Sequence, residues 1–201
     1  YTIPNIPQES VPAGNSDEDN ELISQHGDLP VLHDAAKPHW ELVKDYDIID
    51  FELGNKITGA GFPVYKNKGA RIQRALINYF LDKNTAAGYV EMQVPHLVNE
   101  ASGYGTGKLP DKEGQMYHGG IDDLYLIPTG EVPITNIYRG RLLEMKDFPI
   151  VMTGYTPCFR REAGSYGSDV RGLNRLHQFD KVEILRIEHP DKSDAALDAM
   201  V

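Results

Sequence analysis

Apolar residues along the chain recur in two spacings, one typical of helices and one typical of strands. Between residues 66 and 83 they stand at positions 70, 72, 76, 77, 80 and 81, which predicts an amphipathic helix that Gly88 terminates. Residues 89–95 (YVEMQVP) alternate and stop at a proline, which predicts a strand. We expect a short helix within residues 39–59 and a short strand at 61–65.

Three more strands are predicted in the second half of the chain. Residues 124–128 form the first, which runs into a turn before a helix that begins at Glu131 and continues to Tyr138. The other two are residues 153–160 and 176–187, both rich in aromatic or β-branched side chains. The loop between them holds glycines for backbone turns at 164, 167 and 172. The glycine-rich residues 103–110 lack the Gly-Lys-Ser/Thr ending of a phosphate loop, so we interpret them as a plain loop.

Composition places the chain among ordinary globular proteins. It has 201 residues, of which 40% are hydrophobic and 25% charged, enough for one domain with a short appendage. The single cysteine, Cys158, excludes an internal disulfide and suits a reducing cytoplasm. The sequence has no apolar run of transmembrane length. A net charge of −10 argues against a general nucleic-acid surface, so any RNA contact must be local.

A basic cluster flanks the loop between the last two predicted strands. It consists of Arg160, Arg161, Arg171 and Arg175, with Glu162 and Asp169 beside them in sequence. Guanidinium groups present planar forks that fit phosphate oxygens two at a time, which suits a clamp on a polyphosphate. An exposed hairpin held by surface salt bridges accounts for the same residues, and the pattern alone leaves both interpretations open.

A hydroxyl and a carboxylate stand two residues apart where the strand at 124–128 ends. Thr129 and Glu131 could hold a small zwitterion, and Thr129 could equally cap the helix that follows. Glu183 lies in an otherwise apolar strand, where a carboxylate needs a partner. Phe179, in the same strand, is a core residue unless a ligand stacks on it.

The loop and its flanking strands resemble motif 2 of the class II aminoacyl-tRNA synthetases. The sequence CFRREAG at 158–164 contains the Phe-Arg-x-Glu core of that class. The pieces RGL at 171–173 and HQFDKVE at 177–183 narrow the resemblance to the seryl-tRNA synthetases. In addition, TGE at 129–131 resembles the serine-binding Thr-x-Glu loop of that family, whose middle residue is often alanine. Residues 66–97 resemble motif 1, which makes dimer contacts.

The resemblance implies the fold and the activity. The fold would be α+β, an antiparallel sheet flanked by helices. The activity would be that of a serine–tRNA ligase, which activates L-serine with ATP and Mg²⁺ as seryl-adenylate and transfers it to tRNA(Ser). The family also implies a cytoplasmic homodimer that does not enter a membrane.

The resemblance further assigns a role to each matching residue. The catalytic set would be Arg160 on the α-phosphate, Glu162 on the adenine amino group and Arg175 on the outer phosphates. Arg161, Leu176 and Phe179 would complete the nucleotide site, with Phe179 stacked on adenine. Thr129, Gly130, Glu131 and Glu183 would bind serine, and Glu183 would also assist Mg²⁺. By their residue type alone, we interpret Arg161, Arg171 and Lys181 as surface or tRNA-facing charges. Arg161 thus has two interpretations, this one and a place in the nucleotide site.

The resemblance also predicts how the chain is organised. Residues 1–38 would be an extended lead-in after a coiled-coil arm, and 39–201 a partial catalytic core with motif 1 at about 66–97 and motif 2 at about 153–187. The sequence contains neither that arm nor motif 3, so we expect a central catalytic-domain segment that is weakly active or inactive alone. The alternative is a synthetase-like binding module or an enzyme that aminoacylates a carrier protein.

Overall fold

The structure is a computed structural model that describes residue 3, residues 6–162 and residues 171–201. The predicted turns at Gly164 and Gly167, and the acidic Asp169, lie outside the described residues. The chain divides into two compact units, Tyr1–Lys37 and Pro38–Val201. Each unit is considered by itself below.

The described residues of the first unit form no α-helix and no β-strand. It contains one short 3₁₀ turn, Asp17–Asp19. The Asp19 carboxylate accepts the backbone N–H groups of Asn15 at 2.7 Å and Ser16 at 3.2 Å. These bonds lower the pKa of Asp19. The described residues of this unit are all exposed, so local hydrogen bonds rather than a core give it what order it has.

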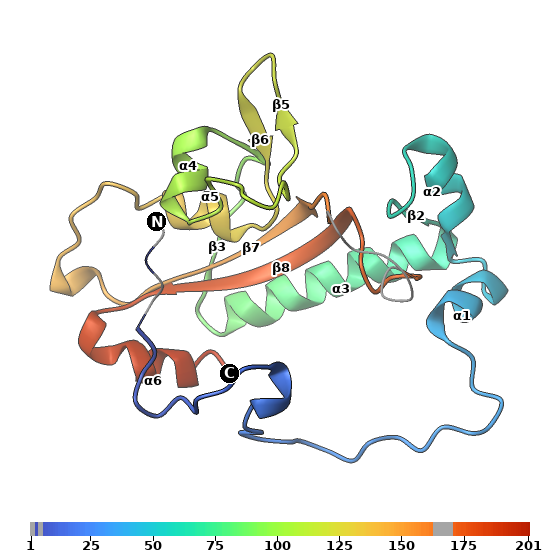
Figure 1. Ribbon diagram of the computed structural model, residues 1–201, viewed down its shortest axis with the longest axis horizontal. Coiled ribbons are helices and arrows are strands. Elements are labelled where there is room, and N and C mark those ends of the chain that lie inside the picture. Colours follow the sequence, from blue (N-terminus) through green and yellow to red (C-terminus); the bar gives the residue numbers. More distant parts are fainter. Residues whose placement is uncertain (1–2, 4–5, 163–170) are drawn as a thin grey trace. The chain divides into compact units, whose positions relative to one another are not determined.

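The second unit contains six helices and eight strands among its described residues (Figure 1). The helices are α1 (His39–Asp45), α2 (Phe51–Ile57), α3 (Asn67–Ala86), α4 (Glu100–Gly105), α5 (Glu131–Asn136) and α6 (Ser193–Asp198). The strands are β1 (Ile49–Asp50), β2 (Val64–Tyr65), β3 (Val90–Glu91), β4 (Leu97–Val98), β5 (His118–Gly119), β6 (Leu124–Leu126), β7 (Ile150–Phe159) and β8 (Gln178–Ile187). Short 3₁₀ turns occupy Met145–Asp147 and Pro190–Lys192.

The long hairpin β7–β8 is the centre of this unit. Its strands pair antiparallel over their whole length, from Ile150 opposite Ile187 to Phe159 opposite Gln178. Strand β3 joins the other edge of β7 in parallel. The sequence prediction of two strands flanking a polar loop is therefore confirmed, and the sheet is mixed because β3 is parallel.

Helix α3 packs on one face of the hairpin, and Figure 1 shows it running alongside both strands. Asn84 donates to the Thr153 hydroxyl at 2.8 Å, and Gln73 donates to the Asp180 carboxylate. Tyr155 donates to the same carboxylate at 2.6 Å. Burial, with the adjacent Asp180, raises the pKa of the Tyr155 phenol. These polar contacts fix the helix against the hairpin in one register.

A further three-stranded sheet has the order β4–β6–β5. Phe159 donates its backbone N–H to Ile127 O at 2.9 Å, which ties the end of β7 to the segment after β6. Val98, Ile127 and Val132 form a buried cluster here. Cys158 is fully buried nearby, and burial raises the pKa of its thiol, so this cysteine packs as a neutral side chain.

Two local predictions need adjustment. Residues 39–59 contain two helices, α1 and α2, with β1 between them, where one short helix was expected. Asp47 takes φ +50° after α1, and Asp50 caps α2 by accepting the Leu53 N–H at 2.8 Å. The expected loop at 103–110 begins inside α4, which Asn99 caps by accepting from Ser102 N–H at 3.0 Å, so a capping side chain outweighed the glycine content there.

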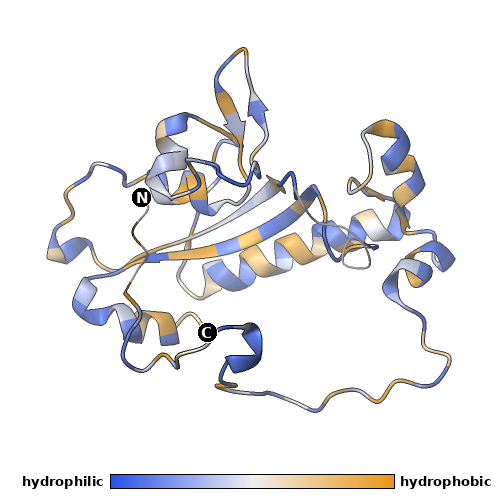
Figure 2. Ribbon diagram, viewed as in Figure 1, coloured by the Kyte–Doolittle hydropathy of each residue, from blue (hydrophilic) through white to orange (hydrophobic). Residues whose placement is uncertain are grey.

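Other predictions were confirmed with shifted ends. The helix expected at 66–83 is α3, and Gly88 follows it with φ +94°. Figure 2 shows apolar residues recurring along α3 and β8. Strand β3 covers only two residues of the expected 89–95, and α5 ends at Asn136 rather than at Tyr138. Among the described residues, α3 is the one helix of membrane-spanning length, and it is too polar to cross a bilayer.

Candidate active site

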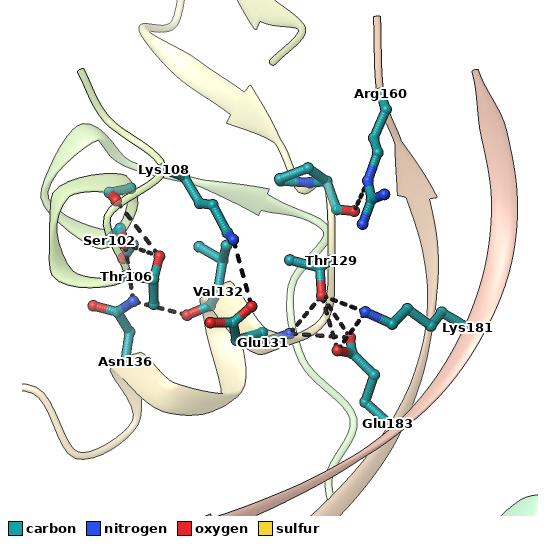
Figure 3. Close-up of polar contacts among 12 residues, drawn as sticks. Ser102, Thr106, Lys108, Thr129, Glu131, Val132, Asn136, Arg160, Lys181 and Glu183 are labelled. Atoms are coloured by element: carbon teal, nitrogen blue, oxygen red, sulfur yellow. Dashed lines mark hydrogen bonds and ion pairs between the residues drawn. The ribbon is translucent and has the colours of Figure 1, made fainter. Parts of the chain in front are cut away.

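A compact polar cluster joins the loop before α5 to strand β8 (Figure 3). The Thr129 hydroxyl lies 2.9 and 2.8 Å from the two carboxylate oxygens of Glu183. The Glu131 backbone N–H donates to Glu183 Oε2 at 3.1 Å. Thr129 is 2% exposed. The carboxylate predicted to need a partner therefore has several, and two residues predicted for one pocket are in contact.

The alternation of side chains along β8 explains this meeting. Phe179, Lys181 and Glu183 are two residues apart and so face the same side of the hairpin. That side is opposite to Asp180, which binds α3. Gly154 stands directly across from Glu183 in the register, and an added Cβ there would lie 3.0 Å from Ile134 Cδ1. The missing side chain lets α5 approach the hairpin next to Glu183.

Gly130 is enclosed between the hairpin strands and its own loop. A Cβ at this position would lie 2.9 Å from Glu183 Oε2 and 3.0 Å from Thr156 Oγ1. Gly130 is also the residue that precedes α5, while the Thr129 hydroxyl accepts the Glu131 N–H at 3.3 Å. The Thr129 hydroxyl thus contacts both the first N–H of α5 and the Glu183 carboxylate. The N-cap of α5 is Gly130 and not Thr129, which corrects the capping interpretation, and the binding of a zwitterion by this loop remains a prediction.

Lys181 belongs to the cluster, which corrects its interpretation as an outward charge. Its Nζ donates to Thr129 Oγ1 at 3.0 Å and lies 2.6 Å from Glu183 Oε1. The alternation of side chains along a strand could have identified Lys181, because residues 179, 181 and 183 face the same side of β8.

Glu131 pairs with a second lysine, Lys108, which was not among the site residues predicted from the sequence. Lys108 Nζ lies 3.6 Å from Glu131 Oε2, and it comes from the glycine-rich segment after α4. An open pocket of about 390 Å³ adjoins these residues. Its lining includes Glu131, Glu183, Ile134 and Arg186. A volume of this size is in the range of small-molecule sites.

Arg160 stands beside the same cluster, at the end of β7. Its Nε donates to Pro128 O at 3.1 Å. Its guanidinium carbon lies 5.1 Å from the centre of the Phe179 ring, within cation–π range. One arginine and one aromatic ring are therefore held next to the Thr129 loop, as the resemblance requires of a nucleotide site beside an amino-acid site.

Glu162 and Arg175 are paired across the two limbs of the loop. Arg175 NH1 lies 3.3 Å from Glu162 Oε2. Glu162 has φ +49°, a left-handed conformation that costs free energy outside glycine and is often kept at functional positions. Leu176 is buried, at 7% exposure, and Arg161 is held through its backbone N–H to Gln115 O at 2.8 Å.

Residues 171–173, which precede β8, contact α1. His39 Nε2 accepts the Leu173 N–H at 2.8 Å, and Arg171 lies over the Trp40 ring at 5.3 Å. An added Cβ on Gly172 would lie 2.2 Å from His39 Nε2. No local pattern indicated these contacts, because residues 39 and 173 are brought together only by the tertiary fold.

His177 supports Arg160 from the other side. Its ring stacks on Phe62 at 5.3 Å, and its Nδ1 lies 3.0 Å from Arg160 O. The His177 N–H also donates to Gly61 O at 2.9 Å. The segment after α2 therefore supports the backbone of Arg160 through His177.

The sequence of the chain is similar to those of known synthetases. Residues 117–201 match the family model described as the tRNA synthetase class II core domain (G, H, P, S and T). The serine–tRNA ligase of Salinibacter ruber is 54% identical over 199 residues, covering 99% of this chain and 46% of that protein. The serine–tRNA ligase of Trichlorobacter lovleyi is 50% identical over 200 residues, covering 99% and 47%.

Solved structures agree as well. The crystal structure of the Pyrococcus horikoshii seryl-tRNA synthetase complexed with ATP superposes with a TM-score of 0.92 at 30% identity, covering 98% of this chain and 48% of that one. By sequence and by fold, the chain is similar to seryl-tRNA synthetases over nearly its whole length. A Naegleria fowleri serine–tRNA ligase structure in complex with AMP gives a TM-score of 0.88 at 25% identity, covering 96% and 46%.

The chain spans about half the length of the curated relatives that it matches. The α+β fold expected from the resemblance is confirmed by both superpositions. The match covers both strands of the hairpin and the Thr129 loop. The individual site residues remain predictions.

Proposed function

We propose that this protein activates L-serine with ATP and transfers the seryl group to tRNA(Ser). The observation that carries the proposal is the contact between Thr129, the Glu131 backbone and Glu183, beside Arg160 over Phe179. A carboxylate with its hydroxyl partner and an arginine with an aromatic ring thus lie close together at the β7–β8 hairpin. The similarity to serine–tRNA ligases over nearly the whole chain supports the same reaction.

Serine would be bound by groups that pair with its ammonium and hydroxyl. The carboxylates of Glu131 and Glu183 accept hydrogen bonds, and the Thr129 hydroxyl both donates and accepts. A site built to bind a hydroxyl discriminates strongly against an analogue that lacks it, because the polar groups are then left unpaired. Alanine should therefore be a poor substrate.

The phosphates of ATP would be bound by arginines. The serine carboxylate is ionised at neutral pH and attacks the α-phosphorus, so the step needs alignment and charge neutralisation rather than a general base. Arg160 would contact the α-phosphate and Phe179 would stack on adenine. Arg175 would leave Glu162 to reach the outer phosphates, which frees the Glu162 carboxylate for the adenine amino group. Arg161 and Leu176 would complete this site.

Mg²⁺ is proposed to enter with ATP, on the phosphates. Among the described residues, no three His, Cys, Asp or Glu side chains gather as a metal-binding group. Both Glu183 oxygens already accept hydrogen bonds from Thr129, and Lys181 pairs with one of them. Protein sites for Mg²⁺ in phosphoryl chemistry commonly use one or two carboxylates plus phosphates. The assignment of Glu183 as a metal ligand remains a prediction, and this arrangement does not favour it.

The proposed activity is tested by serine-dependent exchange of labelled pyrophosphate into ATP. The protein should be measured in the full length of its reading frame and as residues 1–201, with alanine and threonine as controls. We expect serine-selective exchange by the full-length protein. The absence of exchange with any of the three amino acids would contradict serine activation and favour a binding module. Charging of tRNA(Ser) then separates the ligase from an enzyme that aminoacylates a carrier protein.

A homodimer through α3 is the second part of the proposal. Ile72, Leu76, Tyr79 and Phe80 recur three and four residues apart, and each is between 49 and 54% exposed. Side chains with this spacing share one face of a helix, and the α3 contacts to the hairpin use Gln73 and Asn84 instead. An apolar stripe of this kind marks an interface. We infer that a second copy covers it, in agreement with the resemblance to motif 1.

Replacing Leu76 by glutamate should halve the molar mass in solution. The charge would be buried without a partner in the interface. This weakens the free energy of association by several kcal/mol, which raises the Kd of the dimer on the order of a hundredfold or more. Sedimentation velocity measures the change. The matched control is Asn78→Glu, on the same helix but about 160° away from Leu76 around its axis, and it should remain a dimer. Equal masses for Leu76→Glu and the unmodified protein would contradict this interface.

The remaining part of the proposal concerns tRNA and the cellular compartment. tRNA(Ser) is proposed as the acceptor, and the cytoplasm as the site of the reaction. The unpaired, buried Cys158 is compatible with a reducing compartment.

A further inference from the structure

Lys181 occupies a place in the site that a substrate ammonium would be expected to take. Its Nζ lies 2.6 Å from Glu183 Oε1 and 3.0 Å from Thr129 Oγ1 (Figure 3). Both partners are groups that the proposed function gives to serine. An ammonium donates and never accepts, so the lysine and the amino group of serine require the same acceptors.

Without any ligand, each of the two carboxylates proposed for serine is already paired with a lysine. Glu131 is paired with Lys108 at 3.6 Å, and Glu183 is paired with Lys181 at 2.6 Å. Serine adds one positive and one negative group. If its ammonium bound Glu183 while Lys181 stayed in place, two positive charges would share one carboxylate, and like charges at such a distance repel. This repulsion is avoided if Lys181 moves to the negative end of the substrate.

Lys181 is able to make that movement, whereas Glu183 is held. The lysine side chain is 36% exposed and the glutamate side chain 15%. A lysine has a flexible four-carbon stem and a compact charge. Glu183, in contrast, is fixed by the Thr129 hydroxyl and by the Glu131 N–H. The mobile member of the pair is therefore the cation.

We propose that Lys181 exchanges places with the substrate ammonium. In the empty site Lys181 holds Glu183 and Thr129 in position. When serine binds, its ammonium takes the contact with Glu183, and Lys181 turns to the substrate carboxylate and the α-phosphate that this carboxylate attacks. Lys181 is then a substrate-contacting residue that neutralises charge in the activation step. This inference rests on the proposed function.

The test uses two variants of the full-length protein, Lys181→Met and Lys181→Arg, and two ligands. Serine carries both charges, and serinamide keeps the ammonium but lacks the carboxylate. Pyrophosphate exchange gives kcat and the KM for serine, and inhibition of exchange gives the Ki of serinamide. The control is Lys146→Met, which breaks a lysine–glutamate pair of the same 2.6 Å length that is exposed to solvent.

For Lys181→Met we expect kcat to fall about tenfold or more, because a cation near the reacting groups is lost. We expect the Ki of serinamide to fall about threefold to tenfold, because this ligand no longer has to displace a cation. Lys181→Arg should retain most of kcat. Lys146→Met should leave all three quantities unchanged, and thermal unfolding should confirm that each variant is folded.

Two results would overturn the exchange. If Lys181 only orients Glu183, the Ki of serinamide and the KM for serine rise together in Lys181→Met while kcat stays constant. If Lys181 plays no part, Lys181→Met matches the unmodified protein. Both results differ from a failure of the proposed function, in which the unmodified protein itself shows no serine-dependent exchange.

Discussion

Replacing Glu183 by glutamine should lower serine-dependent pyrophosphate exchange by about a hundredfold to a thousandfold in kcat/KM. The amide has nearly the same size, but it carries no negative charge and presents an NH₂ group. The Thr129 hydroxyl, the Glu131 N–H and the Lys181 ammonium all donate toward this side chain. Donors would then face donors, and losing the anion from such a charged network costs about 3–4 kcal/mol.

The same measurement should show a nearly unchanged KM for ATP, because Glu183 is assigned to serine and not to the nucleotide. The matched control is Glu188→Gln. Its carboxylate is also a paired one, 2.6 Å from Arg186 and 7% exposed, and the bond to Arg186 and the His189 N–H lower its pKa. Glu188→Gln should reduce stability without changing selectivity for serine. A Glu183→Gln protein with ordinary serine kinetics would remove this residue from the pocket.

Replacing Gly54 by alanine should destabilise the second unit by about 3 kcal/mol or prevent it from folding. A Cβ at this position in α2 would lie 1.6 Å from Phe62 O and 3.3 Å from Pro63 Cα. Both obstacles are backbone atoms, which cannot rotate away as a side chain can. Overpacking of this kind costs about 1–3 kcal/mol and occasionally more. Urea unfolding monitored by circular dichroism measures the loss.

The matched control for this prediction is Gly120→Ala, where no atom lies within 4 Å of the added carbon. We expect a change within about 0.5 kcal/mol there, as for most surface positions. The Gly54 variant should also bind ATP less tightly, because Phe62 stacks on His177, which contacts Arg160 O. Equal unfolding midpoints for the two variants would contradict the prediction, because they would show that the backbone at Phe62 moves away from the added carbon at little cost in free energy.

The chemistry of the site was more predictable from sequence than its geometry was. Thr129, Glu131, Arg160, Phe179 and Glu183 were selected because their residue types, in those motifs, resemble a synthetase site. The contact of Thr129 with Glu183 was not predictable from spacing, because 54 positions separate them. It depends on how the loop before α5 lies against β8.

The residues that were missed have weak local signals. Lys108 lies in a glycine-rich stretch, and His39 stood in the sequence without any partner. In the structure Lys108 pairs with Glu131, and His39 accepts from the Leu173 N–H. Both depend on packing between distant segments, which no local pattern encodes.

The sequence by itself determined the elements with strong periodicity, namely α3 and the hairpin β7–β8. Hydrophobic spacing over ten residues or more specifies one periodicity and excludes the other. The sequence also predicted a class of chemistry, through residue types in contiguous motifs that resemble those of synthetases. Only the tertiary structure decided that Lys181 faces Thr129 and Glu183, that Gly54 touches Phe62, and that α1 holds the loop at Leu173. The physical reason is that such contacts join segments far apart in the chain, and their geometry is fixed by packing of the whole unit rather than by the conformational preference of any one residue.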